Sequence, residues 1–406
     1  MAENRQKPLV VVAGQVPPPT GGQNVMIQRI VDELTGDGRW RTVHLPFHFT
    51  QNFQTVRRFR VSKINELFAV WWRFLRIVMV FGRPDLLIYP SGGSQTVPVI
   101  RDILLLPLLC FLSKRVVVQF HAAGVAARLA ESSGVIESLL RLAYNRVDGA
   151  IVMTNFNRRD PEALGIRKIA VIPHRLPDEN PERHLPDYKG FEKADSPTPR
   201  HSSLNPSHNE QRAIDIQHPA CFNILHAGHL YDLKGTPQLV EAFGTIAAKY
   251  PWAKLVLMGE FLPPYSEEAC RARCRELDIK DRIEITGVLR GERKASRFRG
   301  AHLFIFPSIA PYESFGLVMV EAMMWGLPIV ASDWRGNRDV AGPKTAYVPA
   351  DYALHDHLSE VLQQRLSAPT ELSGLSIDSR QRYEKYFRSE TGEGDYRRLA
   401  NKILFQ

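Results

Sequence analysis

Residues 306–332 read FPSIAPYESFGLVMVEAMMWGLPIVAS, and this stretch decides the fold that we expect for the chain. An apolar run ends at Phe306, and a loop with Pro307 and Pro311 follows it. Ser314 can then cap a helix that starts near Phe315. A second apolar run, residues 328–331, follows this helix. The order of strand, loop, helix and strand predicts one unit of a parallel sheet that helices cover.

The helix start and its two glutamates give this stretch its chemistry. The free backbone N–H groups of Phe315, Gly316 and Leu317 form a positive pole suited to a phosphate. Eight residues separate Glu313 from Glu321, which is ~12 Å of height in a helix and too far for an acid and a base acting on one atom. We therefore expect Glu321 to hold a ribose and Glu313 a second sugar of one extended ligand. On spacing alone, a carboxylate in the N-terminal turn and a solvated helix face explain the pair equally well.

Apolar runs separated by helical stretches recur along the chain. Near-continuous apolar strands are typical of parallel sheets that helices cover on both faces. In the first part of the chain the predicted strands are residues 9–13, 86–89, 116–120, 150–153 and 169–172. In the second part they are residues 222–226, 254–258, 283–285, 303–306 and 328–331. The pattern predicts an α/β protein with two doubly wound domains.

Changes in composition set the predicted domain boundaries. Residues 1–178 form the first domain, and residues 220–376 form the second. Between them, residues 179–219 are rich in Pro, Ser, His and charge and lack apolar periodicity, so they are a linker or a surface insertion. Residues 377–406 hold a charged amphipathic helix over 379–405, and its pattern leaves open whether it packs back on the first domain.

The composition bounds the class of protein. An apolar share of 44% and a charged share of 23% over 406 residues are ordinary for a globular chain with two cores. The net charge of +9 favours nucleic acid, anionic lipid headgroups or phosphorylated small molecules as partners. Because no nucleic-acid-binding motif is visible and the basic residues are scattered, we expect no nucleic acid partner. Four cysteines in so long a chain do not indicate a disulfide scaffold, and Cys270 and Cys274 lack further ligands for a zinc site. We therefore expect neither a disulfide scaffold nor a metal site.

Three apolar segments bear on the location of the protein. Residues 9–13 precede a proline run and are a strand, not a cleavable signal, so we expect a cytoplasmic protein. The longest apolar run, residues 103–112, is shorter than the ~20 residues that span a bilayer. Residues 66–81, ELFAVWWRFLRIVMVF, are aromatic and apolar, interrupted by Arg73 and Arg76. A buried packing helix is the favoured interpretation, and a helix that gives peripheral contact with the inner face of the cell membrane is the alternative.

Residues 306–332 resemble the signature of the retaining glycosyltransferases of family 4. The resemblance covers the Glu-x7-Glu spacing of Glu313 and Glu321, Ser-Phe-Gly after the first glutamate, Glu-Ala after the spacer and the closing Gly-Leu-Pro-Ile-Val-Ala-Ser. It implies the GT-B fold, in which two doubly wound Rossmann-like domains flank a cleft. It also implies an enzyme of class EC 2.4 that transfers a hexosyl group from a UDP- or GDP-sugar to a glycan or lipid-linked acceptor with retention of configuration. It implies no metal or other cofactor, and a role in surface polysaccharide or glycolipid biosynthesis.

Residues 226–237, HAGHLYDLKGTP, resemble the motif with which the same family grips the diphosphate. A lysine near a glycine-rich turn, here Lys234, can neutralise a diphosphate that gains negative charge as the sugar leaves. Taken alone, Lys234 is more often a surface residue at a helix start. Gly228 keeps the family's glycine, but His229 stands where the family has arginine. Because histidine is largely neutral at pH 7, the resemblance implies that this chain binds the diphosphate more weakly, or that another group supplies the missing charge of this diphosphate clamp.

Two further segments follow predicted strands of the first domain. Gly21 and Gly22 close the loop PPPTGG after the first strand, at the edge where doubly wound folds bind ligands. His121 follows the strand of residues 116–120 at the same edge. A plain turn and a structural histidine are the simpler interpretations. The resemblance implies that the glycines lie near the diphosphate and the acceptor, and that His121 contacts the donor sugar.

The resemblance thus implies two groups of site residues. The expected catalytic residues are Glu313, His121 and Lys234. The expected donor-binding residues are Gly21, Gly22, Gly228, His229, Ser314, Phe315, Gly316, Leu317 and Glu321. Looser matches occur at residues 259–260, 287–288 and 335–340 (RGNRDV), and in the last of these Arg335, Arg338 and Asp339 replace the family's Gly, Pro and Glu.

Two other classes of protein fit parts of the sequence. A dinucleotide-dependent oxidoreductase also uses doubly wound domains, but it requires G-x-G-x-x-G after the first strand, and Gly14 is followed by Gln15 and prolines. His229 and the positive charge favour instead a catalytically weak or non-catalytic GT-B-like binding protein. Binding of nucleotide sugars or of NAD separates these classes.

Overall fold

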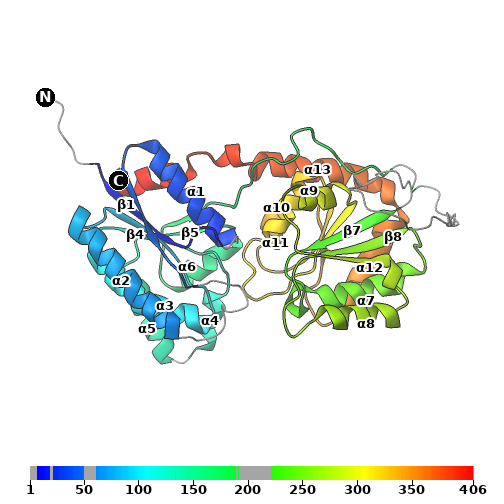
Figure 1. The fold of residues 1–406 in the computed structure, drawn as a ribbon, viewed down its shortest axis with the longest axis horizontal. Helices are drawn as coiled ribbons and strands as arrows, with labels where there is room; N and C mark the ends of the chain where they lie inside the picture. Colours follow the sequence, from blue (N-terminus) through cyan, green and yellow to red (C-terminus); the bar gives the residue numbers. More distant parts are fainter. Residues whose placement is uncertain are drawn as a thin grey trace, which may run out of the picture. The chain divides into compact units, whose positions relative to one another are not determined.

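The computed structural model of the chain describes residues 7–18, 22–49, 61–132, 134–188, 191 and 221–405. The chain divides into two compact units. The first unit comprises Met1–Arg175, Pro311–Leu317 and Ser389–Gln406, and the second comprises Leu176–Ala310 and Val318–Arg388. Within the described residues, each unit holds one parallel six-stranded sheet with helices on its faces (Figure 1). The predicted α/β class with two doubly wound sheets is therefore confirmed.

The sheet of the first unit has the strand order β2-β1-β3-β4-β5-β6. Its strands are β1 (Leu9–Gly14), β2 (Arg41–Pro46), β3 (Leu86–Pro90), β4 (Val116–Gln119), β5 (Gly149–Val152) and β6 (Ile169–Val171). Its helices are α1 (Gly22–Asp37), α2 (Val61–Phe81), α3 (Thr96–Leu112), α4 (Val125–Glu131), α5 (Gly134–Tyr144), α6 (Arg159–Ala163) and α14 (Asp395–Phe405). Every residue of β1, β3, β4 and β5 is buried, as expected of strands that helices cover on both faces.

Two apolar layers enclose this sheet. One layer includes Phe74 of α2 and Leu105 of α3, and the other includes Ile30 of α1 and Tyr396 of α14. Figure 1 shows α2, α3 and α5 on one side of the sheet and α1 on the other. The side-chain amide of Gln119 donates to the hydroxyl of Tyr396 at 3.2 Å. The last helix of the chain is therefore part of the first unit.

The C-terminal tail is not the single helix over residues 379–405 that the sequence predicted. The structure has two helices there, α13 (Leu372–Tyr386) in the second unit and α14 in the first. Gly394, directly before α14, has a φ of 80°, a left-handed conformation that interrupts a helix. The prediction was wrong because the amphipathic pattern continues across the break, while each helix packs on a different unit.

The sheet of the second unit has the strand order β12-β11-β10-β7-β8-β9. Its strands are β7 (Phe222–Ala227), β8 (Ala253–Met258), β9 (Ile283–Gly287), β10 (Leu303–Phe306), β11 (Ile329–Ser332) and β12 (Ala346–Val348). Its other helices are α7 (Thr236–Ala247), α8 (Glu267–Glu276), α9 (Gly291–Arg299), α10 (Leu317–Met324), α11 (Asn337–Ala341) and α12 (Leu354–Ser367), of which α10 begins at the last residue of a first-unit segment.

Each sheet changes direction once beside its first strand. β1 leads to β2 on one side and has β3 on its other side. β7 leads to β8 on one side and has β10 on its other side. Doubly wound folds bind ligands at the carboxyl ends of the strands, where the strand order reverses in this way. The segments after β1, β3, β7 and β10 are therefore the places to look for a site.

Candidate functional site

The two segments that leave the switch point of the second unit lie against each other. β10 pairs with β7 in parallel, with Phe304 opposite Leu225. Beyond the strand ends, the backbone N–H of Ile309 donates to the carbonyl oxygen of Leu233 at 2.9 Å. The lysine motif follows β7 and the stretch with the two glutamates follows β10. The fold thus brings the beginnings of both motifs to one edge of the sheet.

Two glycines at this edge leave room beside the backbone. Gly228 follows β7 and Gly259 follows β8, with φ angles of 135° and 153°. A Cβ at Gly259 would lie 1.7 Å from the carbonyl oxygen of Gly228, so any side chain there would displace the turn. A Cβ at Gly228 would meet no described atom within 4 Å. The open space next to Gly228 allows a ligand to approach the backbone.

A buried histidine joins the elements at this edge. His226 of β7 contacts the carbonyl oxygen of Ile305 through Nδ1 at 3.0 Å and the hydroxyl of Thr236 through Nε2 at 3.1 Å. Burial lowers the pKa of His226 to about 4, so the ring is neutral at pH 7. Because a carbonyl can only accept, Nδ1 carries the proton and Nε2 accepts from the threonine. His226 therefore links β7 to β10 and α7, and it serves the structure of the site.

Lys234 ends a short 3-10 helix, Asp232–Lys234, directly before α7. Its Nζ lies 5.5 Å from the centroid of the Phe306 ring, at the end of β10. The next residue, Gly235, has a φ of 71°, and a Cβ there would lie 2.4 Å from the carbonyl oxygen of Pro307. Glycine at this position therefore allows the turn with the lysine to pack against the segment after β10.

Glu321 of α10 forms an ion pair that the sequence did not predict. Lys294 of α9 donates to its Oε1. Burial raises the pKa of Glu321, and the positive charge of Lys294 opposes this rise. The other oxygen, Oε2, is buried and has no hydrogen-bond partner among the described residues. The pair borders a cavity of about 40 Å³. A ligand hydroxyl that donates to Oε2 would satisfy this carboxylate.

The helix α10 begins later than predicted. It starts at Leu317, so Phe315 and Gly316 belong to the loop before it. Gly316 has a φ of 63°, which is left-handed and outside the helical range. The hydroxyl of Ser314, predicted to cap the helix, donates to the carbonyl oxygen of His121 at 2.6 Å. The pole of free N–H groups therefore begins at Leu317.

The loop Pro311–Leu317, which carries Glu313, belongs to the first unit. The backbone N–H of Ala123 donates to the carbonyl oxygen of Tyr312 at 3.3 Å. The side-chain amide of Asn157 donates to the carbonyl oxygen of Ser314 at 2.9 Å. Ala123 follows β4 and Asn157 follows β5, so the loop is hydrogen-bonded to the segments beyond two adjacent strands.

Two histidines lie beside this loop. The ring centroids of His121 and His174 are 6.2 Å apart, and the ring of His174 stands edge-on to Phe315 at 5.0 Å. Burial lowers the pKa of both histidines to about 3, so both rings are neutral at pH 7. Both ring nitrogens of His121 and Nδ1 of His174 are buried and have no hydrogen-bond partner among the described residues. The two rings are therefore suited to hydrogen bonds with an uncharged ligand hydroxyl.

Asp160 fixes the turn that follows His121. Its carboxylate accepts hydrogen bonds from the backbone N–H groups of Gly124 at 3.0 Å and Ala126 at 2.8 Å. Gly124 has a φ of 104°, and a Cβ there would lie 2.9 Å from the carbonyl oxygen of Pro311. The turn and the loop with Glu313 are thus held close together by backbone contacts.

The predicted site residues fall into two sets. The structure places Gly22, His121, Glu313, Ser314, Phe315, Gly316 and Leu317 in the first unit. It places Gly228, His229, Lys234 and Glu321 in the second unit. Gly21 lies outside the described residues. His121 and Ser314 are in direct contact through a hydrogen bond, whereas the two glutamates of the signature belong to different units.

Three residues of this arrangement were missed at the level of the sequence. His174 and Asn157 follow β6 and β5, so the strand-end rule that selected His121 could have found them. Lys294 lies among other charged residues on the surface helix α9. No local signal distinguishes it from them, because its partner on α10 is chosen by the tertiary fold.

The loose match at residues 335–340 is held by contacts within the second unit. Arg335 has a φ of 48°, a left-handed conformation that favours glycine. Arg338 makes two hydrogen bonds of 2.6 Å to the carboxylate of Asp333, and both residues are exposed. This surface pair occupies the guanidinium of Arg338.

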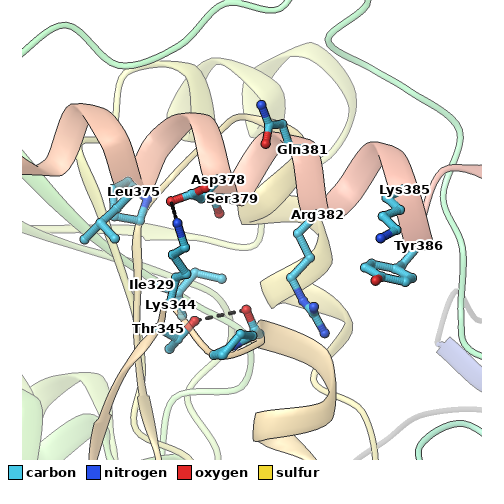
Figure 2. A pocket seen from close by; sticks show the side chains of 13 residues that line it. Ile329, Lys344, Thr345, Leu375, Asp378, Ser379, Gln381, Arg382, Lys385 and Tyr386 are labelled. Atoms are coloured by element: carbon cyan, nitrogen blue, oxygen red, sulfur yellow. Dashed lines mark hydrogen bonds and ion pairs between the residues drawn. The ribbon is translucent and has the colours of Figure 1, made fainter.

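A larger cavity of the second unit lies away from these motifs. It measures about 350 Å³ and is lined by the start of β11, the loop before β12 and α13. Figure 2 shows Lys344 paired with Asp378 at 3.0 Å, and Arg382 projecting from α13. Arg382 donates to the carbonyl oxygens of Val340 and Asp339 at 2.6 Å each. Because β11 and β12 begin here, the cavity lies at the opposite edge of the sheet from the switch point.

Solved structures give the fold its class. The chain matches sucrose-phosphate synthase from Thermosynechococcus elongatus with a TM-score of 0.69 at 18% identity, covering 99% of this chain and 100% of that one. It matches HepE of Anabaena in complex with UDP and glucose with a TM-score of 0.62 at 14% identity, covering 98% and 99%. The chain therefore has the GT-B fold of glycosyltransferases, as predicted.

Part of the sequence matches a known family. Residues 219–389 match the family glycosyl transferases group 1. The MMP alpha-(1->4)-mannosyltransferase of Mycolicibacterium hassiacum is 33% identical over 159 residues, which are 38% of this chain and 36% of that protein. Matches to curated relatives span about a third of the relatives' length. The predicted resemblance is thus confirmed as a match of residues 219–389 to group 1 glycosyltransferases, and the retaining family 4 stays a prediction.

Proposed function

We propose that the protein is a glycosyltransferase that moves a hexosyl group from a UDP- or GDP-sugar to a glycan or lipid-linked acceptor, with retention of configuration. The observation that carries the proposal is the content of the group 1 segment, residues 219–389. This segment holds Gly228 and Lys234 after β7, and Glu321 with a buried oxygen that lacks a partner among the described residues. The complex of HepE with UDP and glucose supports a nucleotide-sugar donor.

The donor's nucleotide and diphosphate are assigned to the second unit. Glu321 accepts a hydrogen bond from a ribose hydroxyl at Oε2, while Lys294 holds Oε1. Lys234 and the free N–H groups at the start of α10 stabilise the diphosphate as its negative charge grows. His229, half-buried after Gly228, contributes less positive charge at pH 7 than an arginine would.

The transferred hexose is assigned to residues of the first unit. The neutral His121 exchanges a hydrogen bond with a sugar hydroxyl, and the carboxylate of Glu313 accepts another. The bond between the anomeric carbon and the phosphate oxygen breaks as the acceptor oxygen bonds to the same face of that carbon. The acceptor's proton passes to the departing phosphate oxygen. No side chain has to form a covalent intermediate, because the acceptor oxygen bonds directly to the anomeric carbon, and no side chain has to act as the base, because the leaving phosphate accepts the proton.

The cellular role follows from the chemistry of the acceptor. Enzymes that build surface polysaccharides or glycolipids join hexoses to glycans or lipid-linked acceptors, and we assign the protein to such a cytoplasmic step. We retain one alternative because His229 stands where the family has arginine. In this alternative the protein is a catalytically weak or non-catalytic GT-B-like protein that binds nucleotide sugars.

Calorimetry with UDP-glucose, GDP-mannose and NAD tests the donor class. We expect one nucleotide sugar to bind and NAD not to bind. Binding of NAD alone would overturn the proposal. Binding without transfer or slow hydrolysis of the nucleotide sugar would favour the non-catalytic alternative. A retained anomeric configuration in the product, read by NMR, tests the stereochemistry separately.

Replacing Lys234 tests whether this side chain stabilises the diphosphate. Lys234→Met should lower turnover about 100-fold, since it removes a charge that stabilises the leaving group. Lys249→Met is the matched control, because Lys249 is an exposed lysine just beyond α7. Equal turnover of the two variants would remove Lys234 from the mechanism.

A further inference from the structure

One face of α2 is apolar and exposed, although the sequence favoured a buried helix. Val70 and Phe74 are fully buried against the sheet. On the other face, Phe68, Trp72 and Met79 have exposed fractions of 59%, 60% and 68%. Their spacing places these three side chains on one stripe of the helix. The helix α2 is therefore apolar on both its inner and its outer face.

The neighbouring helices α3 and α5 continue this exposed apolar surface. The exposed apolar side chains are Ile100, Leu104 and Phe111 on α3 and Val135, Leu139 and Leu142 on α5. Each set repeats at helical spacing and forms one stripe. The helix α3 packs against both α2 and α5, and Figure 1 shows the three helices side by side. We call the exposed apolar side chains of α2, α3 and α5 the docking surface.

A basic rim borders the docking surface. In a parallel sheet the crossover helices run opposite to the strands, so α2, α3 and α5 end at the same edge. Arg83, Lys114 and Arg146 follow these helix ends, and all three are exposed. Arg76 is exposed on α2 itself, between Trp72 and Met79 on the apolar stripe. Residues 61–148 hold ten lysines and arginines against six aspartates and glutamates.

Two acidic side chains at this edge accept hydrogen bonds from backbone N–H groups. Asp85 accepts from the N–H of Leu9 at 2.7 Å, and it pairs with Lys114 at 2.8 Å. Asp148 accepts from the N–H of Val116 at 2.7 Å. Both carboxylates accept hydrogen bonds from residues at the starts of strands, and their charge lowers the positive potential of the rim.

The combination of charge and apolar area selects one kind of partner. Apolar patches of this extent mark interaction surfaces. No helix in the described part of the chain is long and apolar enough to cross a membrane. A dry protein interface would leave the guanidinium of Arg76 buried among apolar groups, which is costly without a paired carboxylate. At a bilayer surface, the same side chain extends to the phosphate headgroups while its stem and the Trp72 ring lie at the acyl boundary.

We propose that the docking surface lies in the interface of a bilayer that contains anionic phospholipids. The apolar stripes of α2, α3 and α5 enter the boundary between headgroups and acyl chains. Arg76, Arg83 and Arg146 contact the lipid phosphates, whereas Lys114 is paired with Asp85. This inference goes beyond the proposed transfer reaction, which proceeds with a soluble acceptor as well. Membrane binding and donor binding are measured separately, so either can fail alone.

Vesicle sedimentation with the full chain tests the inference. We expect binding to phosphatidylcholine vesicles that contain phosphatidylglycerol, and little binding to phosphatidylcholine alone. Binding should weaken at about 0.5 M salt, because salt screens the attraction between the rim and the headgroups. Replacing Arg76 and Arg146 by glutamine should lower the affinity about fivefold for each charge removed.

A matched pair of variants isolates the apolar contribution. Trp72→Ser combined with Met79→Ser and Phe111→Ser should lower vesicle affinity at least roughly tenfold, since it removes apolar area from the surface. The control is Tyr352→Ser with Ile377→Ser, which removes exposed apolar side chains of the second unit. The control should bind vesicles as the wild type does.

Three outcomes would overturn the inference. The first is a folded wild-type protein that does not bind the anionic vesicles, and the second is a triple variant that binds them as tightly as the control. The third is a wild-type dimer in sedimentation velocity that the triple variant converts to a monomer, with no vesicle binding by either. In that case a second copy of the chain covers the docking surface. Circular dichroism and UDP binding verify that each variant is folded.

Discussion

The strand-end regions that hold the candidate residues of the two units differ in the charge of their basic side chains. In the second unit, Lys234 and the pair of Lys294 with Glu321 carry charge. In the first unit, His121 and His174 are neutral, because burial lowers the pKa of each to about 3. A nucleotide sugar has the same division, since its diphosphate is charged and its hexose is not. The difference supports a division of labour in which the second unit binds the charged half of the donor.

The two regions also share a feature. Each contains a buried polar atom without a hydrogen-bond partner among the described residues, Oε2 of Glu321 in one and the ring nitrogens of His121 in the other. An unsatisfied buried polar atom is costly in a folded protein, so a ligand hydroxyl that pairs with one of these atoms would lower that cost. We therefore expect variants of the two regions to have separable effects on ligand binding.

The largest expected effect is that of Glu313→Gln in the first unit. The substitution keeps the size of the side chain and removes the charge that we assign to the transferred sugar. Turnover should fall about 100-fold while the affinity for the free nucleotide changes little, because the nucleotide is bound by the second unit. Initial rates and calorimetry with UDP or GDP measure the two quantities.

Unchanged turnover of Glu313→Gln would remove this residue from the mechanism. An equal loss of turnover and nucleotide affinity would contradict the proposed division between the units. Thermal unfolding is the control, because Glu313 is largely buried and a changed midpoint would indicate a structural role.

Much of the fold was predictable from the sequence, for a local reason. Parallel strands are apolar runs bounded by turns, so residues 222–226 were recognised as a strand and the structure has β7 there. The break between α13 and α14 was not predictable, because each helix is placed by packing on a different unit. The exposure of one face of α2 was only the alternative at the level of the sequence, since a helix with apolar residues on several faces does not reveal which face the sheet covers.

The candidate site was predictable only where a residue follows a strand. His121 was selected because it follows a strand at the expected edge, Gly228 and Lys234 were selected through the family motif, and the structure places all three beyond strand ends. Lys294 was missed because its contact with Glu321 joins two helices that no local pattern relates. The catalytic and donor-binding roles of these residues stay predictions.

The ion pair of the second unit should have the next largest effect. Glu321→Gln removes the charged acceptor for a ribose hydroxyl and should weaken nucleotide binding roughly tenfold, with turnover at saturation nearly unchanged. Lys294→Met should weaken binding similarly, and the double variant should lose less than the sum, because the two side chains act as a pair. Calorimetry on the three variants measures the coupling.

The raised pKa of Glu321 adds a dependence on pH to this prediction. As the pH falls toward the raised pKa, the carboxylate takes up a proton and loses its strength as an acceptor. Wild-type affinity for the nucleotide should therefore decline as the solution is acidified, and Glu321→Gln should show a smaller decline. Glu267→Gln, an exposed carboxylate of α8 paired with Arg271, is the control. Parallel pH profiles of wild type and Glu321→Gln would contradict the assignment.

The buried neutral histidines of the first unit should make the free energy of unfolding depend on pH. His174 has a pKa of about 3 in the folded chain and about 6.5 when unfolded. Below pH 6.5 the unfolded chain takes up a proton that the folded chain does not, so the free energy of unfolding falls by about 1.4 kcal/mol per pH unit for this group. Urea unfolding at pH 7, 6 and 5 should show His174→Gln with a shallower decline than wild type. Equal slopes of the free energy of unfolding against pH for wild type and His174→Gln would contradict a neutral His174 in the folded protein.

The smallest effect, and the most direct test of the charge difference, is that of His229→Arg. The side chain lies half-buried after Gly228, in the loop that we assign to the diphosphate. An arginine adds a permanent positive charge and a planar pair of donors, so affinity for the nucleotide diphosphate should rise about fivefold at pH 7. A variant that binds no better than wild type at pH 7 would show that another group already completes the clamp. The difference between the units would then rest on Lys234 and that group.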